Sequence, residues 1–251
     1  MIPCAGFCMS LKKAIKKYIE AISIRVAPIT CTRYTSWLEL FYKCVKKDIE
    51  DITYGDIVKY QHSLTNRARA TQFSYMIPVI SLLKFHGRVD LSGRIMLPKF
   101  VHENPVLEAT PRHIRQLVKV IDNGTYFLRL RNKLIIELCS KTGIRISELL
   151  NLQVDDFKKT ERGLRIKSSK SYLRRYIRWT AKVNRLLQRY IELRRPLAHC
   201  ESLLINTSGN AITARQVQRI FRELKDRAGI KEKITPHSLR VGFISDSVRK
   251  K

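Results

Sequence analysis

Residues 142–157 read TGIRISELLNLQVDDF, and they follow the largely apolar run YFLRLRNKLIIELCSK at residues 126–141. Gly143 comes where this run stops, which predicts the end of a helix, because glycine adopts the left-handed conformation of helix C-termini without steric cost. RISELLNL then predicts a short second helix. Arg145 therefore stands at a junction between two helices, next to the glycine that ends the first.

Helical patterns surround this stretch on both sides. In the first half, four helices are expected, and each begins at a capping residue: Ser10, Thr30, Thr53 or Thr65. The last of them is expected to extend to Arg88, with a kink at Pro78. In the second half, Thr110–Pro111 predicts a helix start, since proline suits the first helical position. Further helices are expected at residues 180–195, 213–228 and from Pro236 onward. GLRIKSS at 163–169 and LRRYIRW at 173–179 predict two strands of a hairpin.

The two halves are separated by a segment without periodicity. Residues 93–108 contain Gly93, Pro98 and Pro105, a pattern typical of a linker. The sequence thus predicts a mainly α, two-domain protein. A helical domain is expected at residues 1–92, and a mostly helical domain with a small antiparallel sheet at 109–251.

Charge is the strongest signal in the composition. The 251 residues contain 49 Lys and Arg against 21 Asp and Glu, a net charge of +28. Residues 1–110 contain 16 basic and 9 acidic residues, whereas residues 111–251 contain 33 and 12. Such a field favours a polyanionic partner, with nucleic acid as the first candidate. Ribosomal and membrane-surface proteins share such charge, so composition alone indicates binding and not chemistry.

Other classes of site are disfavoured. The six cysteines include no C-x-x-C pair, and no second ligand pair follows Cys4 and Cys8, so we expect no zinc site. No apolar stretch has membrane-spanning length, and MIPCAGFCMS lacks the features of a signal peptide. We expect a cytoplasmic protein with reduced thiols, no cofactor and no membrane partner. Met9, directly before a clear helix start, is a candidate initiator.

Four basic residues stand at predicted helix ends or turns. They are Arg145 after Gly143, Lys170 in the expected hairpin turn, and His237 and Arg240, three residues apart at a helix start. Two guanidinium groups can hold both non-bridging oxygens of a phosphodiester, while histidine and lysine can move protons. No acidic cluster of the kind used by two-metal nucleases accompanies them. The set predicts phosphoryl chemistry without a metal.

These residues also resemble a known family. TGIRISELLNLQVDDF is similar to the first motif of the tyrosine recombinases, the phage-integrase family, which read T-G-x-R-x-x-E-L, and PHSLRVGF is similar to their H-x-x-R motif. The resemblance covers nearly the whole chain. It implies a helical, SAM-like core-binding domain, a linker, and a catalytic domain with a β-hairpin between the two motifs.

The resemblance assigns roles by position. It implies that Arg145 and Arg240 hold the scissile phosphate of double-stranded DNA and that His237 contacts this phosphate and handles a proton. Lys170 matches the hairpin lysine that protonates the leaving 5′-oxygen, with Lys167 as the competing assignment. Glu148 would be a buried support for Arg145. The remaining basic residues expected to contact DNA are Arg67, Arg69, Lys167, Arg174 and Arg175.

The nucleophile of the family has no match. It is a tyrosine that follows the H-x-x-R motif, whereas this sequence has no tyrosine after Tyr190 and ends eleven residues after Arg240. Tyr172, Tyr176 and Tyr190 all precede Arg240. Three explanations are open: a fragment, a tyrosine supplied by another polypeptide, or a protein that only binds DNA. We expect weak protomer pairing on DNA without that tail.

The sequence is consistent with three alternative functions. The first is a site-specific recombinase or integrase that lacks its nucleophile here. The second is an inactive DNA-binding relative, an accessory or competitor at recombination sites. The third is a general basic nucleic-acid-binding protein.

Overall fold

The computed structural model describes residues 9–99, 106–157, 162–167 and 174–249, and at Lys167 and Arg174 it describes the backbone only. The chain divides into two compact units, Met1–His102 and Glu103–Lys251. Each unit has its own hydrophobic core. The predicted linker at residues 93–108 spans the boundary between them.

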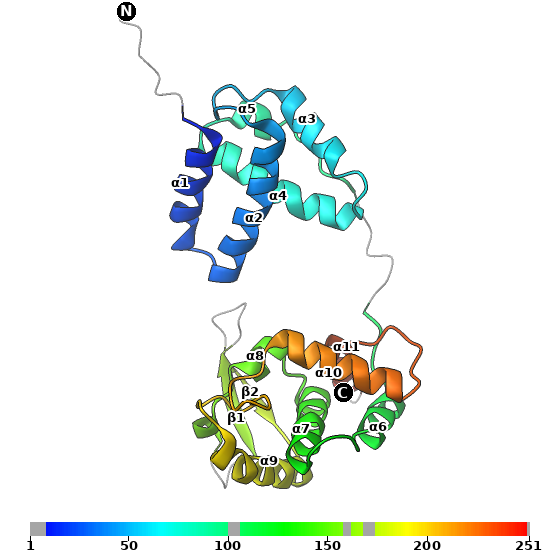
Figure 1. The fold of residues 1–251 in the computed structure, drawn as a ribbon. Coiled ribbons are helices and arrows are strands. Elements are labelled where there is room, and N and C mark those ends of the chain that lie inside the picture. Colours follow the sequence, from blue (N-terminus) through cyan, green and yellow to red (C-terminus); the bar gives the residue numbers. More distant parts are fainter. Residues whose placement is uncertain (1–8, 100–105, 158–161, 168–173, 250–251) are drawn as a thin grey trace, which may run out of the picture. The chain divides into compact units, whose positions relative to one another are not determined.

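The first unit is a small helical bundle (Figure 1). Its elements are α1 (Leu11–Ser23), α2 (Pro28–Val45), α3 (Tyr54–Ser63), α4 (Arg69–Phe85) and α5 (Val89–Ser92). α2 packs against α1, α3 and α4. The core contains Leu38 and Phe41 of α2 and Tyr60 of α3, all at most 1% exposed. Thr53 and Asp56 form the predicted capping box of α3.

Two helices begin elsewhere than predicted. α2 begins at Pro28, two residues before Thr30, because proline is favoured in the first turn of a helix. α4 begins at Arg69 and ends at Phe85, so the helix predicted from Thr65 to Arg88 is shorter at both ends. At its start the chain makes turns instead, in which Thr65 N donates to the His62 carbonyl.

The second unit surrounds α7 (Figure 1). Its elements are α6 (Pro111–Lys119), α7 (Tyr126–Thr142), α8 (Ile146–Leu150), the 3₁₀ turn η1 (Val154–Asp156), β1 (Gly163–Lys167), β2 (Arg174–Arg178), α9 (Ala181–Arg194), the 3₁₀ turn η2 (Arg195–Leu197), α10 (Ala214–Arg227) and α11 (Pro236–Arg249). α7 packs against α9 on one side and α11 on another, and it carries the apolar residues that the sequence placed in a buried helix. Gly143 ends α7 with φ 57°, which confirms the predicted glycine stop.

The predicted hairpin is present. β1 and β2 pair antiparallel, with Leu164 opposite Ile177 and Lys167 opposite Arg174. Leu164, Ile166 and Ile177 are buried, so the hairpin lies with one face on the core of the second unit. The mainly α fold with one small antiparallel sheet is thereby confirmed. No helix in the described part of the chain is both long and apolar enough to cross a membrane.

Candidate phosphate-binding site

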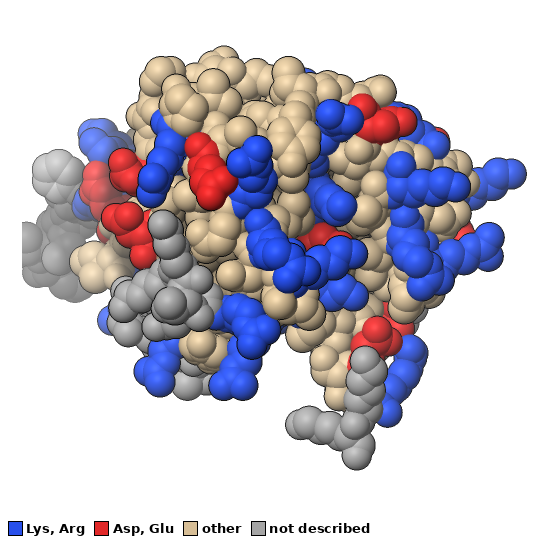
Figure 2. Space-filling model, turned by 90° about the horizontal axis from the view of Figure 1, so that it is seen from below, with Lys and Arg blue, Asp and Glu red and all other residues tan. Residues whose placement is uncertain are grey.

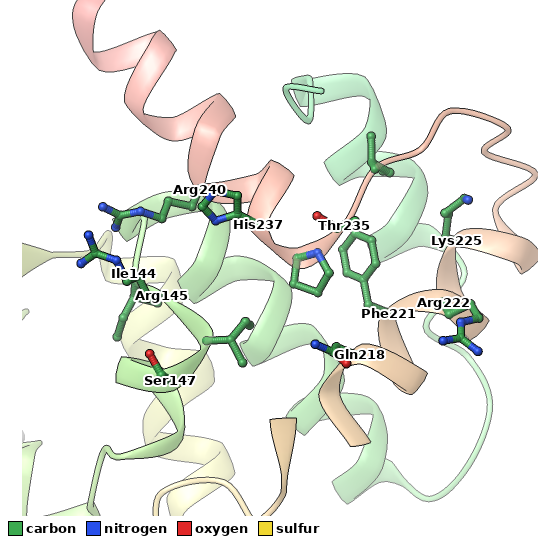
Figure 3. Close-up of a pocket in the computed structure, with 13 residues that line it drawn as sticks. Ile144, Arg145, Ser147, Gln218, Phe221, Arg222, Lys225, Thr235, His237 and Arg240 are labelled. Carbon is green, nitrogen blue, oxygen red and sulfur yellow. The ribbon is translucent and has the colours of Figure 1, made fainter. Parts of the chain in front are cut away.

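The site forms where the end of α7, the start of α8 and the start of α11 meet. Residues from these segments and from α10 line a pocket of about 710 Å³. Figure 3 shows Arg145, His237 and Arg240 on one side of this pocket and Arg222 and Lys225 on the other. No Asp or Glu stands among the described residues that line it. The pocket therefore combines a positive potential with room for a phosphate group.

Helix capping places His237 and Arg240. Ser238 Oγ accepts a hydrogen bond from Thr235 N at 3.0 Å, and Thr235 Oγ1 accepts one from Ser238 N at 3.4 Å. This reciprocal cap begins α11, and Ser238 and Leu239 point into the protein. His237 and Arg240 are three residues apart and thus share the opposite face, which borders the pocket.

The segment that enters the second unit holds the rest of α11. Ala109 N donates to the Ser238 carbonyl at 3.0 Å. Glu108 accepts from Ser245 Oγ at 2.6 Å and from Arg249 Nη2 at 3.1 Å. α11 is therefore fixed at its first turn and again near its end.

Glu148 holds the first arginine. Its side chain is 1% exposed, and Arg145 Nη1 donates to Glu148 Oε1 at 2.7 Å. Arg145 N also donates to Glu148 Oε2 at 2.9 Å, so the carboxylate binds both the backbone and the side chain of the same residue. Arg145 keeps 33% of its side chain exposed. The carboxylate can thus orient the guanidinium while leaving part of it open to the pocket.

A third arginine enters the same network. Arg175 Nη2 donates to Glu148 Oε2 at 2.7 Å and to the Gly143 carbonyl at 3.1 Å. The Gly143 carbonyl also accepts a hydrogen bond from Arg240 Nη1. Arg145 and Arg175 therefore share the Glu148 carboxylate, and Arg175 and Arg240 share the Gly143 carbonyl.

Charge and burial shift two pKa values in this network. Burial raises the pKa of Glu148, but hydrogen bonds from Arg145 N and from the Arg175 and Arg145 side chains outweigh it and lower the pKa overall. Burial, together with the positive charges of Arg175 and Arg145, lowers the pKa of Arg240. Three guanidinium groups around one carboxylate leave the site with an excess of positive charge, which favours an anion.

The other predicted residues have different surroundings. Lys170 lies outside the described residues, so the choice between Lys170 and Lys167 stays a prediction. Lys167 ends β1 and Arg174 begins β2, where they face each other in register. In the first unit, Arg67 and Arg69 are exposed, and the Arg67 guanidinium lies 5.0 Å from the centre of the Tyr75 ring.

The α10 side of the pocket was not predicted from the sequence. Gln218, Arg222 and Lys225 line it from α10, in a helical spacing of four and three residues. That spacing on the polar face of an amphipathic helix was the available signal.

Figure 2 shows Lys and Arg side chains widely spread over one face of the molecule, with fewer Asp and Glu among them.

The described tyrosines that precede Arg240 do not line the pocket. Tyr190 is fully buried, and its hydroxyl accepts a hydrogen bond from Ile205 N at 3.2 Å. Burial raises the pKa of Tyr190 to about 12. Tyr176 is 50% exposed on β2, and Tyr172 lies outside the described residues. None of the described tyrosines lines the pocket.

Comparison with known proteins gives a consistent family. The model of the phage integrase family matches residues 109–250. The tyrosine recombinase XerC of Leptospira interrogans is 25% identical over 251 residues, an alignment covering 94% of this chain and 80% of that protein. The XerC of Staphylococcus aureus is 32% identical over 152 residues, covering 59% of this chain and 47% of the relative.

Solved structures share the fold at low sequence identity. The Tn1549 transposon integrase in complex with transposon right end DNA superposes with a TM-score of 0.76 at 16% identity, covering 96% of this chain and 87% of that one. A lambda integrase dimer bound to a COC′ core site gives a TM-score of 0.73 at 16% identity, covering 94% and 69%. XerH recombinase bound to its difH substrate gives 0.71 at 20% identity, covering 96% and 73%.

Proposed function

The chain belongs to the phage integrase family, and we propose that it binds duplex DNA at a recombination site and holds one backbone phosphate between Arg145 and Arg240. The observation that carries this proposal is the single pocket that Arg145, His237 and Arg240 line together, without an acidic neighbour among the described residues. The relatives named above as tyrosine recombinases support it. So do the integrase and recombinase structures described as DNA complexes.

In this proposal the two arginines provide most of the electrostatic stabilisation of the phosphate. Their guanidinium groups donate to the non-bridging oxygens of the phosphate, and they stabilise the charge that builds up on these oxygens in the transition state. His237, one helical turn before Arg240, donates a hydrogen bond to the same phosphate. Lys170 donates a proton to the leaving 5′-oxygen, as the family resemblance implies.

Strand cleavage also needs a nucleophile. A phenolic oxygen attacks phosphorus, the bond to the 5′-oxygen breaks, and a 3′-phosphotyrosyl link and a 5′-hydroxyl result. Residues 191–251 contain no tyrosine, and Tyr190 is buried in the core. The nucleophile in our proposal therefore comes from outside these 251 residues.

The same observation favours a second candidate function. A chain that holds the phosphate and contributes no nucleophile would occupy recombination sites as an accessory or competitor of an active recombinase. Both functions require double-stranded DNA as partner, in the cytoplasm, and weak pairing of protomers on it. The lambda integrase structures, described as a dimer and a tetramer on DNA, support such pairing.

The test begins with selection of bound sequences from a pool of random duplexes. Inverted repeats are expected, because paired protomers would bind two half-sites. Phosphates of the selected site are then replaced one at a time by neutral methylphosphonates. Wild-type protein should lose affinity most at one phosphate in each half-site, and Arg145→Ala should not distinguish that phosphate from its neighbours. Sequence-independent binding with no sensitive phosphate would contradict the proposal and favour a general basic protein.

A further inference from the structure

Arg175 lies on the inward face of β2. Residues two apart on a strand share a face, and Ile177, two residues on, is 4% exposed and belongs to the core. Arg178 stands on the opposite face and is exposed. The Arg175 side chain, 32% exposed, thus extends toward the end of α7 and the start of α8 instead of outward.

Arg175 shares its two hydrogen-bond acceptors with two other arginines. Glu148 Oε2 accepts from Arg175 at 2.7 Å, while Glu148 Oε1 accepts from Arg145 at 2.7 Å. The Gly143 carbonyl accepts from Arg175 at 3.1 Å and also from Arg240. Arg175 thereby bridges the acceptor that orients Arg145 and the acceptor that orients Arg240.

The position has an energetic cost. Arg175 Nε is buried and has no hydrogen-bond partner in the described structure. A buried donor without a partner lowers the stability of the folded state. The hydrogen bonds of Nη2 to Glu148 and Gly143 offset this cost, and a side chain that presents Nη2 to both acceptors leaves Nε where no acceptor reaches it.

We propose that Arg175 is a positioning residue that fixes the spacing of Arg145 and Arg240 for a phosphate and does not itself bind the DNA. This inference rests on the proposed function, and it replaces the expectation from sequence that Arg175 contacts DNA. Arg175 makes both contacts through Nη2, whose two N–H groups have fixed directions in the planar guanidinium, whereas the ammonium group of lysine rotates on a flexible stem and does not hold such directions.

The experiment follows the Nε–Hε signals of individual arginines by nuclear magnetic resonance during titration with inorganic phosphate. Residue-specific signals separate this site from the diffuse attraction of phosphate to a basic protein. The variant is Arg175→Lys, which preserves the charge. The matched control is Arg178→Lys, on the same strand but the opposite face. Thermal unfolding checks that both variants remain folded, and Arg175→Gln is the second variant if lysine unfolds the protein.

In wild type, phosphate should shift the signals of Arg145 and Arg240 with one common dissociation constant. Arg175→Lys should weaken both by about tenfold, as is typical when a residue that supports ligating groups is lost. Arg178→Lys should change neither. In a Glu148→Gln background, Arg175→Lys should add little further loss, because the two residues act through one network.

Two results overturn the assignment of Arg175 and leave the phosphate site intact. One is unchanged phosphate affinity in Arg175→Lys. The other is an equal loss with and without Glu148→Gln, which would make Arg175 an independent phosphate ligand. If phosphate shifts neither Arg145 nor Arg240 in wild type, the proposed site itself is wrong and this inference fails with it.

Discussion

Gly143 ends α7 directly against Phe243 of α11, so closely that a β-carbon at Gly143 would lie 2.5 Å from Phe243 Cδ1. Gly143 also has φ 57°, a conformation that costs other residues about 1–2 kcal/mol. Its carbonyl accepts hydrogen bonds from Arg175 and Arg240. One glycine therefore fixes the helix end, the contact with α11 and an acceptor of the site.

We predict that Gly143→Ala destabilises the second unit by about 3 kcal/mol, since the cost of the left-handed conformation is increased by the displacement of Phe243. Gly229→Ala is the control, because Gly229 has φ 63° but no atom near its missing side chain. It should cost only about 1 kcal/mol. Urea unfolding can be followed by Trp179 in a Trp37→Phe background, since these are the two tryptophans of the chain. Equal costs for both glycines would contradict the contact with Phe243.

The second prediction separates the carboxylate from the arginines that it holds. Glu148→Ala leaves Arg145 and Arg175 partly buried without their counter-charge, and removing one partner of a buried ion pair typically costs about 3–5 kcal/mol. Arg145→Ala should change the melting temperature little, because its side chain is one third exposed and Glu148 keeps Arg175. Thermal unfolding of the two variants is the measurement. A larger loss for Arg145→Ala than for Glu148→Ala would point to structural salt bridges and against a phosphate site.

The third prediction concerns pH. The pKa of Glu148 in the folded protein lies below its ordinary value of 4.5, so the unfolded chain binds the proton more tightly. The stabilisation due to the ionised carboxylate is therefore complete above about pH 4.5 and is lost as the pH falls through the folded-state pKa. Wild type and Glu148→Gln should differ most in unfolding free energy at neutral pH and converge in acid. A difference that is constant from pH 7 to pH 3 would show that Glu148 does not titrate in this way.

Local patterns in the sequence predict the fold and part of the site. The glycine stop, the capping box at Thr53 and the hairpin each depend on residues close together in the chain, and all three are present. The pairing of Arg145 with Glu148 is likewise local, at a spacing of three residues.

Contacts across the fold were harder to predict. Arg175 and its partner Glu148 are 27 residues apart in the sequence, and Arg240 and Gly143 are 97 residues apart. No helical or strand periodicity predicts contacts at such separations. One signal was available, because the alternation of Arg175, Ile177 and Trp179 places Arg175 on the buried face of its strand. This alternation favours the positioning role that we propose for Arg175, whereas its charge alone favours the predicted contact with DNA.

The fourth prediction concerns DNA affinity. The two compact units carry unequal excesses of positive charge, and we expect both to contact one duplex. If about six phosphates are contacted, the association constant should fall with roughly the fifth power of salt concentration. Residues 1–102 or 103–251 alone should bind far more weakly than the whole chain, because the linker makes the second contact effectively intramolecular. Binding that is insensitive to salt, or equally strong for one unit alone, would contradict this model.

The last prediction is that these 251 residues bind a recombination site without becoming covalently attached to it. Bond exchange requires a phenolic oxygen in line with the leaving 5′-oxygen, and Tyr190 is held in the core with its hydroxyl bonded to Ile205. The assay is a duplex with a nick beside the scissile phosphate, incubated with protein and separated by denaturing electrophoresis. Tyr176→Phe is the control, because Tyr176 is exposed on β2 in the described part of the chain. No adduct is expected for either protein alone, and an adduct should form when a tyrosine-bearing segment of an active relative is added in trans. An adduct that forms with these residues alone and maps to Tyr172, Tyr176 or Tyr190 would overturn the prediction, and its loss in Tyr176→Phe would make Tyr176 the nucleophile.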